Sequence, residues 1–199
     1  MLIRTVPPPI KDPTEFEVNL PPCDKHTLRN GVEVYSLNMG TEDTLMVNWT
    51  FHAGNSYETS NLVATATSQL LKNGTGRLSA FEVNEHFEYY GASLSRHSNH
   101  ETADIVLHCL SRHANELLPV VAEIISDSRF PQNELDIFIQ NSKQKLQVSL
   151  QKCEFVASRL IDAHLFGEGH PYGKYSTPAD YDALRREDLL AFFDEHYRK

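Results

Sequence analysis

The sequence lacks long hydrophobic runs and has few cysteines. No segment approaches the roughly 20 consecutive apolar residues that a membrane-spanning helix needs, and the first residues, MLIRTVPPPIKDP, contain no apolar core of signal-peptide length. The three cysteines, Cys23, Cys109 and Cys153, are far apart and show no C-x-x-C spacing, which favours free thiols in a reducing compartment. We therefore expect a cytoplasmic chain that neither crosses a membrane nor is exported.

Positive charge is also scarce. Lys and Arg together number 18 against 27 Asp and Glu, so the net charge of the 199 residues is −9. This acidic balance argues against a nucleic acid as partner. It is compatible with a basic peptide as ligand, although most acidic proteins are acidic only for solubility. The hydrophobic content of 40% is that of an ordinary globular protein.

Proline is concentrated at one end of the chain. Most of the ten prolines lie in residues 1–22, and this composition predicts an extended arm laid along the surface. Residues 23–199 are numerous enough for one domain with a sizeable core. We therefore expect a proline-rich N-terminal arm followed by a single domain.

The spacing of apolar residues predicts the strands and helices. Asn30-Gly31 between two short apolar runs indicates a β-hairpin, and residues 45–51 alternate as in a half-buried strand. Two further strands, ASLSRHSNH and ETADIVLHCL, are expected to pair. Five helices are expected. The first runs from a cap at Thr59 or Ser60 to Lys72, and the second, AFEVNEHFEYYG, follows a capping box of Ser79 and Glu82. The others run from about Ala114 to Ser128 with Pro119 in the first turn, along the stretch from Pro131 to Phe166, and over REDLLAFFDEHY. The fold class is therefore predicted as α+β, a mostly antiparallel sheet covered by helices.

Five segments follow the order and spacing of a known family. They are NGVEVYSLN, MVNWTFHAGNSYE, ATATSQLLKNGT, NEHFEYYGASLS and LFGEGHPYGKYS. Together they resemble the N-terminal domain of the pitrilysin/insulinase metallopeptidases, which include the mitochondrial processing peptidase. The resemblance covers nearly the whole chain from about residue 25. It implies a metallopeptidase half-barrel domain, the first of two in a longer chain, and two such two-domain units that close around a peptide chamber.

In active members of this family, the helix that matches ATATSQLLKNGT carries the zinc motif H-x-x-E-H. The two His at i and i+4 reach one zinc ion from the same helical face, and the Glu takes a proton from the zinc-bound water. The resemblance places the first His at Thr65, the Glu at Ser68 and the second His at Gln69. The motif here therefore reads Thr65-Ala66-Thr67-Ser68-Gln69.

The resemblance also implies a third zinc ligand, a Glu further along the chain. It corresponds to Gln147 with a one-residue shift, or to Leu146 without one. The acid that supports this ligand corresponds to Gln140 or Ile139. We prefer the pair Gln140 and Gln147, because both are polar and the apolar helical stripe then stays in register. Either choice leaves no carboxylate at the zinc site.

These replacements predict a degenerate metal site. Hydroxyl and amide groups offer zinc no imidazole, thiolate or carboxylate, and none of them is a base near neutral pH. We expect no catalytic residue and no zinc in this chain, with zinc only in an active sibling. The resemblance implies that a non-catalytic member pairs with such a sibling and helps to form the chamber that binds extended peptides.

Other interpretations stay open. Residues 65–69 could form an ordinary solvated helix face that never bound metal. The chain could be an active zinc endopeptidase with other ligands, although neither H-x-x-E-H nor H-E-x-x-H occurs in it. It could also be a purely structural module, like the family-related core subunits of respiratory complexes. Glu82 with His86 is a weaker candidate for a different metal site.

Overall fold

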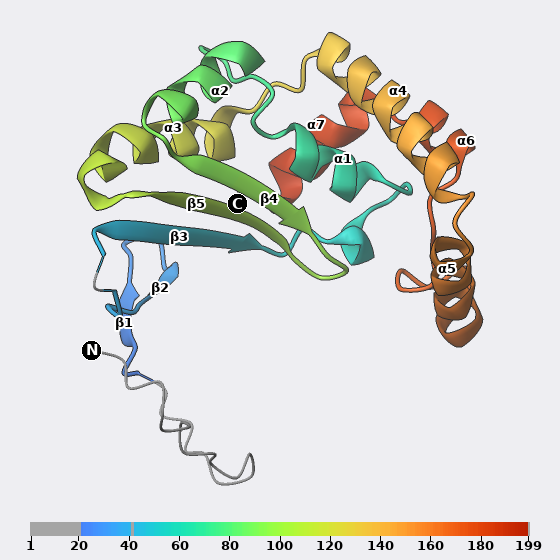
Figure 1. Ribbon diagram of the computed structural model, residues 1–199, viewed down its shortest axis with the longest axis horizontal. Coiled ribbons are helices and arrows are strands. Elements are labelled where there is room, and N and C mark those ends of the chain that lie inside the picture. The colour runs from blue at the N-terminus through green and yellow to red at the C-terminus, as the bar shows by residue number, and fades with distance from the viewer. Residues whose placement is uncertain (1–20, 41, 199) are drawn as a thin grey trace, which may run out of the picture. The chain divides into compact units, whose positions relative to one another are not determined.

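The computed structural model describes residues 21–40 and 42–198, which belong to two units divided between Glu42 and Asp43 (Figure 1). Residues 1–20 of the predicted arm lie outside the described residues, so its extended form stays a prediction. The assignment of residues 23–199 to one domain likewise stays a prediction.

The smaller unit contains a β-hairpin. Strands β1 (Asp24–Thr27) and β2 (Glu33–Ser36) pair antiparallel along their whole length. Gly31 in the turn has a φ of +84°, a conformation that glycine adopts without steric cost. The Asn30 side chain accepts a hydrogen bond from the Val32 N–H and closes the turn. The hairpin predicted from Asn-Gly is therefore confirmed.

The larger unit contains a three-stranded antiparallel sheet in the order β3-β5-β4. Strand β3 spans Thr44–Phe51, β4 spans Ser93–Ser98 and β5 spans Ala103–Leu110. Exposure alternates from residue to residue along β3 and β5, so one face of each strand packs inward. Among the described residues of this unit, β4 pairs with β5 alone and is therefore an edge strand.

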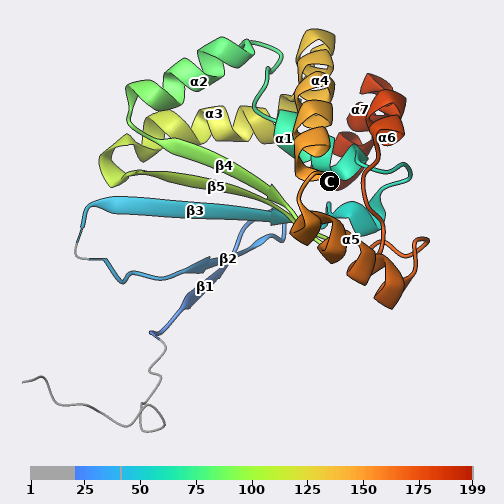
Figure 2. The same ribbon diagram turned by 45° about the vertical axis from the view of Figure 1, so that its right-hand side comes forward.

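Helices cover this sheet. The described residues of the larger unit form α1 (Val63–Leu70), α2 (Ala80–Tyr89), α3 (Ala114–Asp127), α4 (Gln132–Ser149), α5 (Cys153–Phe166), α6 (Pro178–Ala183) and α7 (Arg186–His196). Figures 1 and 2 show α1, α2 and α3 on the same side of the sheet. Antiparallel strands covered by helices confirm the predicted α+β class. No helix in the described ranges is both long and apolar enough to cross a membrane.

The hydrophobic core of the larger unit lies between the sheet and the helices. Its largest fully buried side chains are Val63, Leu71, Val83, Ile105, Leu107, Leu117, Val121, Ile124, Phe130, Leu135, Leu189 and Phe193. Helix α1 is central to this core, because it contacts β4, α4 and α7. These contacts fix the direction of the α1 side chains.

Helix α1 begins differently from the prediction. The sequence predicts a cap at Thr59 or Ser60, but the helix starts behind Leu62, which has a φ of +73° and provides no side-chain cap. Instead, Glu58 Oε2 accepts a hydrogen bond from the Ala64 N–H at 3.0 Å. A hydrogen-bond acceptor is favourable there, since the first N–H groups of a helix have no partner within the helix. Glu58 therefore takes the capping role.

The capping carboxyl group of Glu58 implies a pH dependence of stability. Burial raises the pKa of the Glu58 carboxyl, and hydrogen bonds from the Ala64 and Leu62 backbone oppose the shift. Oε1 is buried and has no hydrogen-bond partner within the described structure. The folded state therefore favours the protonated form. This contribution to the free energy of unfolding is present at acidic pH and is lost as pH rises through the raised pKa.

We expect Glu58→Gln to remove that pH-dependent contribution, because the amide keeps an acceptor for the Ala64 N–H but does not titrate. Urea unfolding of both chains from about pH 4 to about pH 8 measures the difference. The native chain should lose stability relative to the variant over the lower part of this range. Glu168→Gln, at an exposed loop position, is the control. Parallel pH profiles for the native chain and Glu58→Gln would contradict the prediction.

Two further details of the helices differ from the sequence prediction. Pro119 lies inside α3 and not in its first turn, because α3 begins at Ala114, directly after a 3-10 turn. The stretch that ends at Phe166 is not one helix but two. Leu150 donates its N–H to Leu146 O, and its neighbours make tighter turns before α5 starts. These tighter turns end α4 without a glycine or proline, so the sequence contains no signal for the break.

Helix α6 was not predicted. Thr177 and Asp180 form a capping box, and Pro178 occupies the first turn. Lys143 Nζ of α4 forms a salt bridge with Asp182 at 2.6 Å, so α6 is tied to α4. The capping box and the proline are the local signals that identify this short helix.

Candidate functional site

Helix α1 carries the three positions that are predicted to correspond to H-x-x-E-H. Thr65 is half-buried and Gln69 is exposed, and the two lie one turn apart on the same face. Ser68 is only 1% exposed. The helix therefore presents two of these side chains toward the surface and turns the third into the protein.

Ser68 lies beside Tyr197, the residue that follows α7. Burial raises the pKa of the Tyr197 phenol well above its ordinary value, and the neighbouring Ser68 hydroxyl opposes this shift. The phenol oxygen has no hydrogen-bond partner of normal geometry in the described part of the chain, so the two hydroxyls are close without a regular bond. Neither group takes up a proton near neutral pH. The position predicted to correspond to the catalytic Glu thus holds no base.

Strand β4 holds the carboxyl end of α1. Arg96 on β4 donates a hydrogen bond from Nη1 to the Gln69 backbone oxygen at 2.6 Å. A cation at this end is favourable because the last carbonyl groups of a helix are unpaired and carry the negative end of the helix dipole. Sequence reasoning missed Arg96, since no local pattern connects residues so far apart. The contact joins the edge strand to the helix that carries the candidate site.

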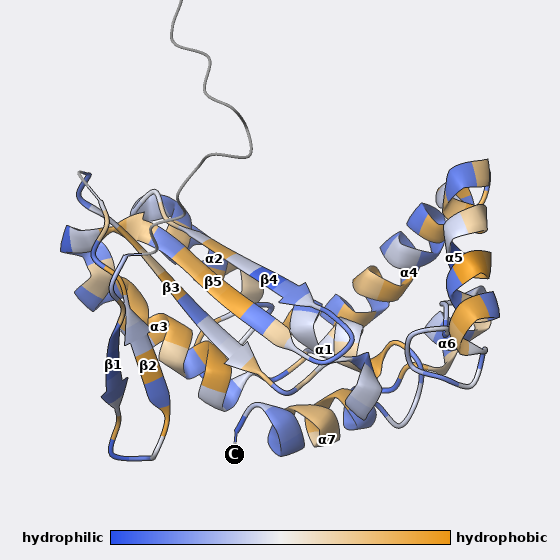
Figure 3. Cartoon of the chain, turned by 90° about the horizontal axis from the view of Figure 1, so that it is seen from below, coloured by the Kyte–Doolittle hydropathy of each residue, from blue (hydrophilic) through white to orange (hydrophobic). Residues whose placement is uncertain are grey.

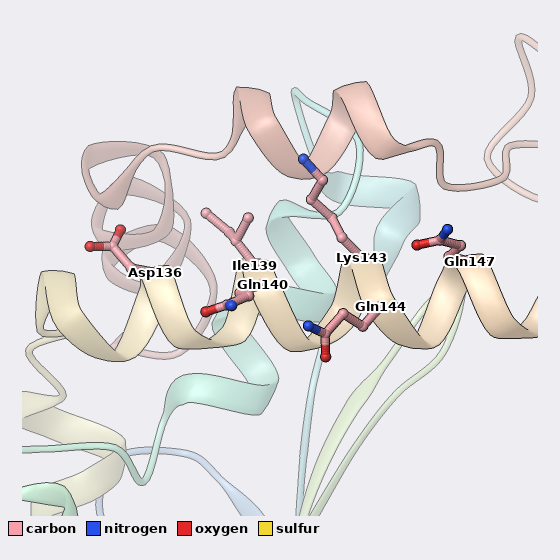
Figure 4. Close-up of a pocket in the computed structure, with 6 residues that line it drawn as sticks. All are labelled: Asp136, Ile139, Gln140, Lys143, Gln144 and Gln147. Atoms are coloured by element: carbon pink, nitrogen blue, oxygen red, sulfur yellow. The ribbon is translucent and has the colours of Figure 1, made fainter.

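Helix α4 carries the remaining two positions. Gln140 and Gln147 are exposed and lie on one open face of α4, which Figure 4 shows with the other residues that line it. Leu146 is 6% exposed, and Ile139 is half-buried. Helices α1 and α4 contact each other. Gln147 matches the exposure of Gln69, whereas Leu146 belongs to the packed side of α4. Which of the two corresponds to the third ligand stays a prediction.

Other side chains do not provide an obvious metal centre. In residues 21–40 and 42–198, no three His, Cys, Asp or Glu side chains gather closely enough to hold a metal ion. Within the weaker candidate pair, the Glu82 carboxylate accepts hydrogen bonds from the backbone and hydroxyl of Ser79. His86 Nε2 lies 3.1 Å from Glu116 O. Each member of that pair therefore has a different partner.

Comparison with known proteins gives distant but consistent relatives. No family model matches the chain. An uncharacterized zinc protease of Rickettsia felis is 24% identical over 174 residues, which are 85% of this chain and 42% of that protein. A probable mitochondrial-processing peptidase subunit beta of Arabidopsis thaliana is 23% identical over 198 residues, covering 96% of this chain and 36% of that protein.

Solved structures share the fold. A peptidase M16 inactive domain from Pseudomonas fluorescens superposes with a TM-score of 0.82 at 20% identity, covering 88% of this chain and 44% of that one. A protease from Helicobacter pylori gives a TM-score of 0.76 at 17% identity, covering 89% of this chain and 44% of that one. The chain is related to the pitrilysin/insulinase (M16) peptidases. The resemblance inferred from the five sequence segments is confirmed.

This relationship has a limited scope. The M16-like chain spans less than half the length of the relatives that it matches. The similar structures establish the fold of the domain, while activity, ligands and partners depend on the residues at the site. Those residues are Thr65, Ser68, Gln69, Gln140 and Gln147, and their correspondence to a metal site stays a prediction.

Proposed function

We propose that this M16-like chain is a non-catalytic member of the family that holds extended peptides and pairs with a zinc-bearing sibling. One observation carries the proposal. Thr65, Ser68 and Gln69 occupy an intact α1 within the family fold, yet none of these side chains is of a type that binds zinc or accepts a proton at neutral pH. Zinc is then supplied by the sibling alone.

The edge strand β4 supports a role in peptide binding. Its outer N–H and C=O groups have no strand partner among the described residues of the larger unit. An extended peptide can add to such an edge through main-chain hydrogen bonds. The Arg96–Gln69 hydrogen bond keeps this edge beside α1. The net charge of −9 favours basic peptides, since an acidic wall raises their local concentration.

Helix α5 supports pairing with another protein. Ala163 is its one buried residue, while hydrophobic residues lie along the helix in Figure 3. Four large apolar side chains are strongly exposed: Leu160 at 55%, Ile161 at 57%, Leu165 at 70% and Phe166 at 49%. A helix that is apolar on several sides is normally covered, and clustered exposed apolar residues mark interaction surfaces. We call these four residues the α5 surface.

The cysteines bear on the compartment in which the proposed pair would act. Cys23, Cys109 and Cys153 are free thiols, two of them exposed. Exposed free thiols suit a reducing compartment, and this supports a cytoplasmic pair.

The decisive test is peptide hydrolysis by the sibling alone, by this protein alone and by their mixture. The mixture is expected to be at least about tenfold faster than the sibling alone, because holding a peptide in one geometry can lower a barrier by several kcal/mol. Higher salt should reduce the gain for basic peptides. Full activity of the sibling alone, unchanged by this protein, would exclude the supporting role.

A further inference from the structure

Two cations, Lys72 and Arg96, lie at the carboxyl end of α1, and neither forms a salt bridge with an acidic residue among those that the structure describes. Arg96 uses Nη1 for the Gln69 carbonyl, and its Nε is buried without a hydrogen-bond partner in the described structure. Lys72 is half-buried just beyond the last turn of the same helix. The salt bridges found among the described residues involve other cations, namely Lys25, Arg77, Arg129, Lys143 and Arg198.

This pair of cations is electrostatically unfavourable as it stands. Burial lowers the pKa of Lys72, the nearby charge of Arg96 lowers it further, and Glu88 opposes the shift only as the smallest contribution. Burial also lowers the pKa of Arg96. Two like charges that are half-buried without a salt-bridge partner in the described structure cost free energy, and the charge of Glu88 offsets only a small part of this cost. The chain has a net charge of −9 and therefore many acidic side chains. None of them forms a salt bridge with Lys72 or Arg96 in the described part of the chain.

We propose that Lys72 and Arg96 form a binding site for a carboxylate group of a peptide. The inference rests on the proposed function, since it deepens how an extended peptide is held at β4. Arg96 is itself a residue of that edge strand, so a peptide added to β4 runs beside its side chain. The Lys72 ammonium and the guanidinium donors not used by Gln69 then provide the charge-assisted hydrogen bonds.

The location adds a chemical argument. Gln69 is predicted to correspond to a zinc ligand of active relatives. In this chain Arg96 contacts the Gln69 backbone oxygen, and Lys72 follows three residues later. A carboxylate is the anion that every peptide carries at its C-terminus and that Asp and Glu carry within a sequence. The two cations therefore allow recognition of an acidic group without metal. A basic peptide with a free C-terminus could place its carboxylate at Lys72 and Arg96, while its basic side chains are attracted by the net negative charge of the chain.

A purely structural role for Arg96 makes different predictions. If Arg96 only caps α1 through the Gln69 carbonyl, Lys72 has no part in ligand binding, and a free carboxylate binds no better than an amide. Lys72 discriminates between the two roles, because its side chain makes no hydrogen bond or salt bridge with another residue of the described ranges. Its substitution tests the site without disturbing the cap on α1.

The first experiment uses the full chain and the smallest suitable probe. N-acetylglycine is compared with N-acetylglycinamide by titration, with thermal unfolding as a second readout. The acid is expected to bind and to raise Tm, and the amide to do neither. Lys72→Met should weaken binding of the acid about tenfold or more, while Lys145→Met, at an exposed position of α4, should leave it unchanged. Equal behaviour of acid and amide, or no effect of Lys72→Met, would overturn the inference.

A second experiment identifies the source of the carboxylate. Three fluorescent peptides of one basic sequence are compared: one with a free C-terminus, one amidated, and one amidated with a single internal Glu. Tight binding of the first alone assigns the site to the C-terminus, and tight binding of the third assigns it to an acidic side chain. Equal binding of all three contradicts the inference. The two proposals can fail separately. If the chain binds N-acetylglycine but does not increase peptide hydrolysis by the sibling, the proposed function is wrong and the carboxylate site is retained.

Discussion

A chain with Thr65→His, Ser68→Glu, Gln69→His and Gln147→Glu is expected to bind one zinc ion, which the unmodified chain is not expected to carry. Positions 65 and 69 share one helical face, so two imidazoles can reach the same ion. Gln147 and Gln69 are both exposed, and their helices α4 and α1 contact each other. Elemental analysis after purification without chelating resin, followed by calorimetry, measures the result.

The same variant is expected to be unstable without zinc. Ser68 is 1% exposed and lies beside the buried Tyr197, so a carboxylate at this position loses hydration and gains no cation. We expect a loss of about 3 kcal/mol, which corresponds to a fall in Tm of about 6–12 °C for a chain of this size. Zinc should restore much of this loss, because binding to the folded state alone stabilises it.

Two matched variants make the test specific. A triple variant that keeps Ser68 should bind zinc without the large loss of stability, because it avoids the buried carboxylate. Replacing Gln147→Glu by Leu146→Glu places the third ligand on the packed side of α4. Zinc binding by the Leu146 variant alone would refute the preferred alignment. Absence of zinc in all three variants would refute the correspondence of α1 to the zinc helix.

Local patterns predicted much of this fold, because the elements concerned are stabilised by nearby residues. The capping box of Ser79 and Glu82 starts α2 as expected. The hairpin turn depends on Gly31, whose positive φ is a local requirement. Strand β3 alternates because one of its faces packs inward along its whole length. In each case the signal and the structure lie within a few residues of one another.

The remaining features depend on contacts that sequence patterns do not encode. Glu58 caps α1 from beyond a turn that includes Leu62 at positive φ, so the nearer Thr59 and Ser60 suggested the wrong start. The break between α4 and α5 has no glycine or proline to announce it. Apolar spacing continues across that break, and the pattern alone therefore favoured one long helix.

The candidate site also has one part that local sequence predicts and one part that depends on tertiary contacts. The helix with the predicted motif positions Thr65, Ser68 and Gln69 could be located, because it and its flanking segments are contiguous in sequence. The partners of these positions could not. Tyr197 reaches Ser68 from the other end of the chain, and Arg96 reaches Gln69 from a strand. Tertiary packing alone brings these residues together.

The α5 surface should decide whether this protein can assist a sibling. A double variant, Ile161→Glu with Leu165→Glu, is expected to weaken association with the zinc-bearing sibling at least about 100-fold. Each substitution places a charge on an apolar surface that pairing would bury, and the few residues that dominate an interface contribute about 2 kcal/mol or more each. The side chains are 57% and 70% exposed, so folding of the chain itself should change little.

The matched control is Phe81→Glu with Tyr89→Glu on α2, two aromatic side chains that are 73% and 81% exposed. This control changes the net charge by the same amount but leaves the α5 surface intact. Sedimentation of each variant mixed with the sibling measures association, and peptide hydrolysis measures the functional result. Circular dichroism and Tm confirm that both variants are folded. If the α5 variant associates and assists as the native chain does, or if the α2 control fails equally, the α5 surface is not the pairing surface.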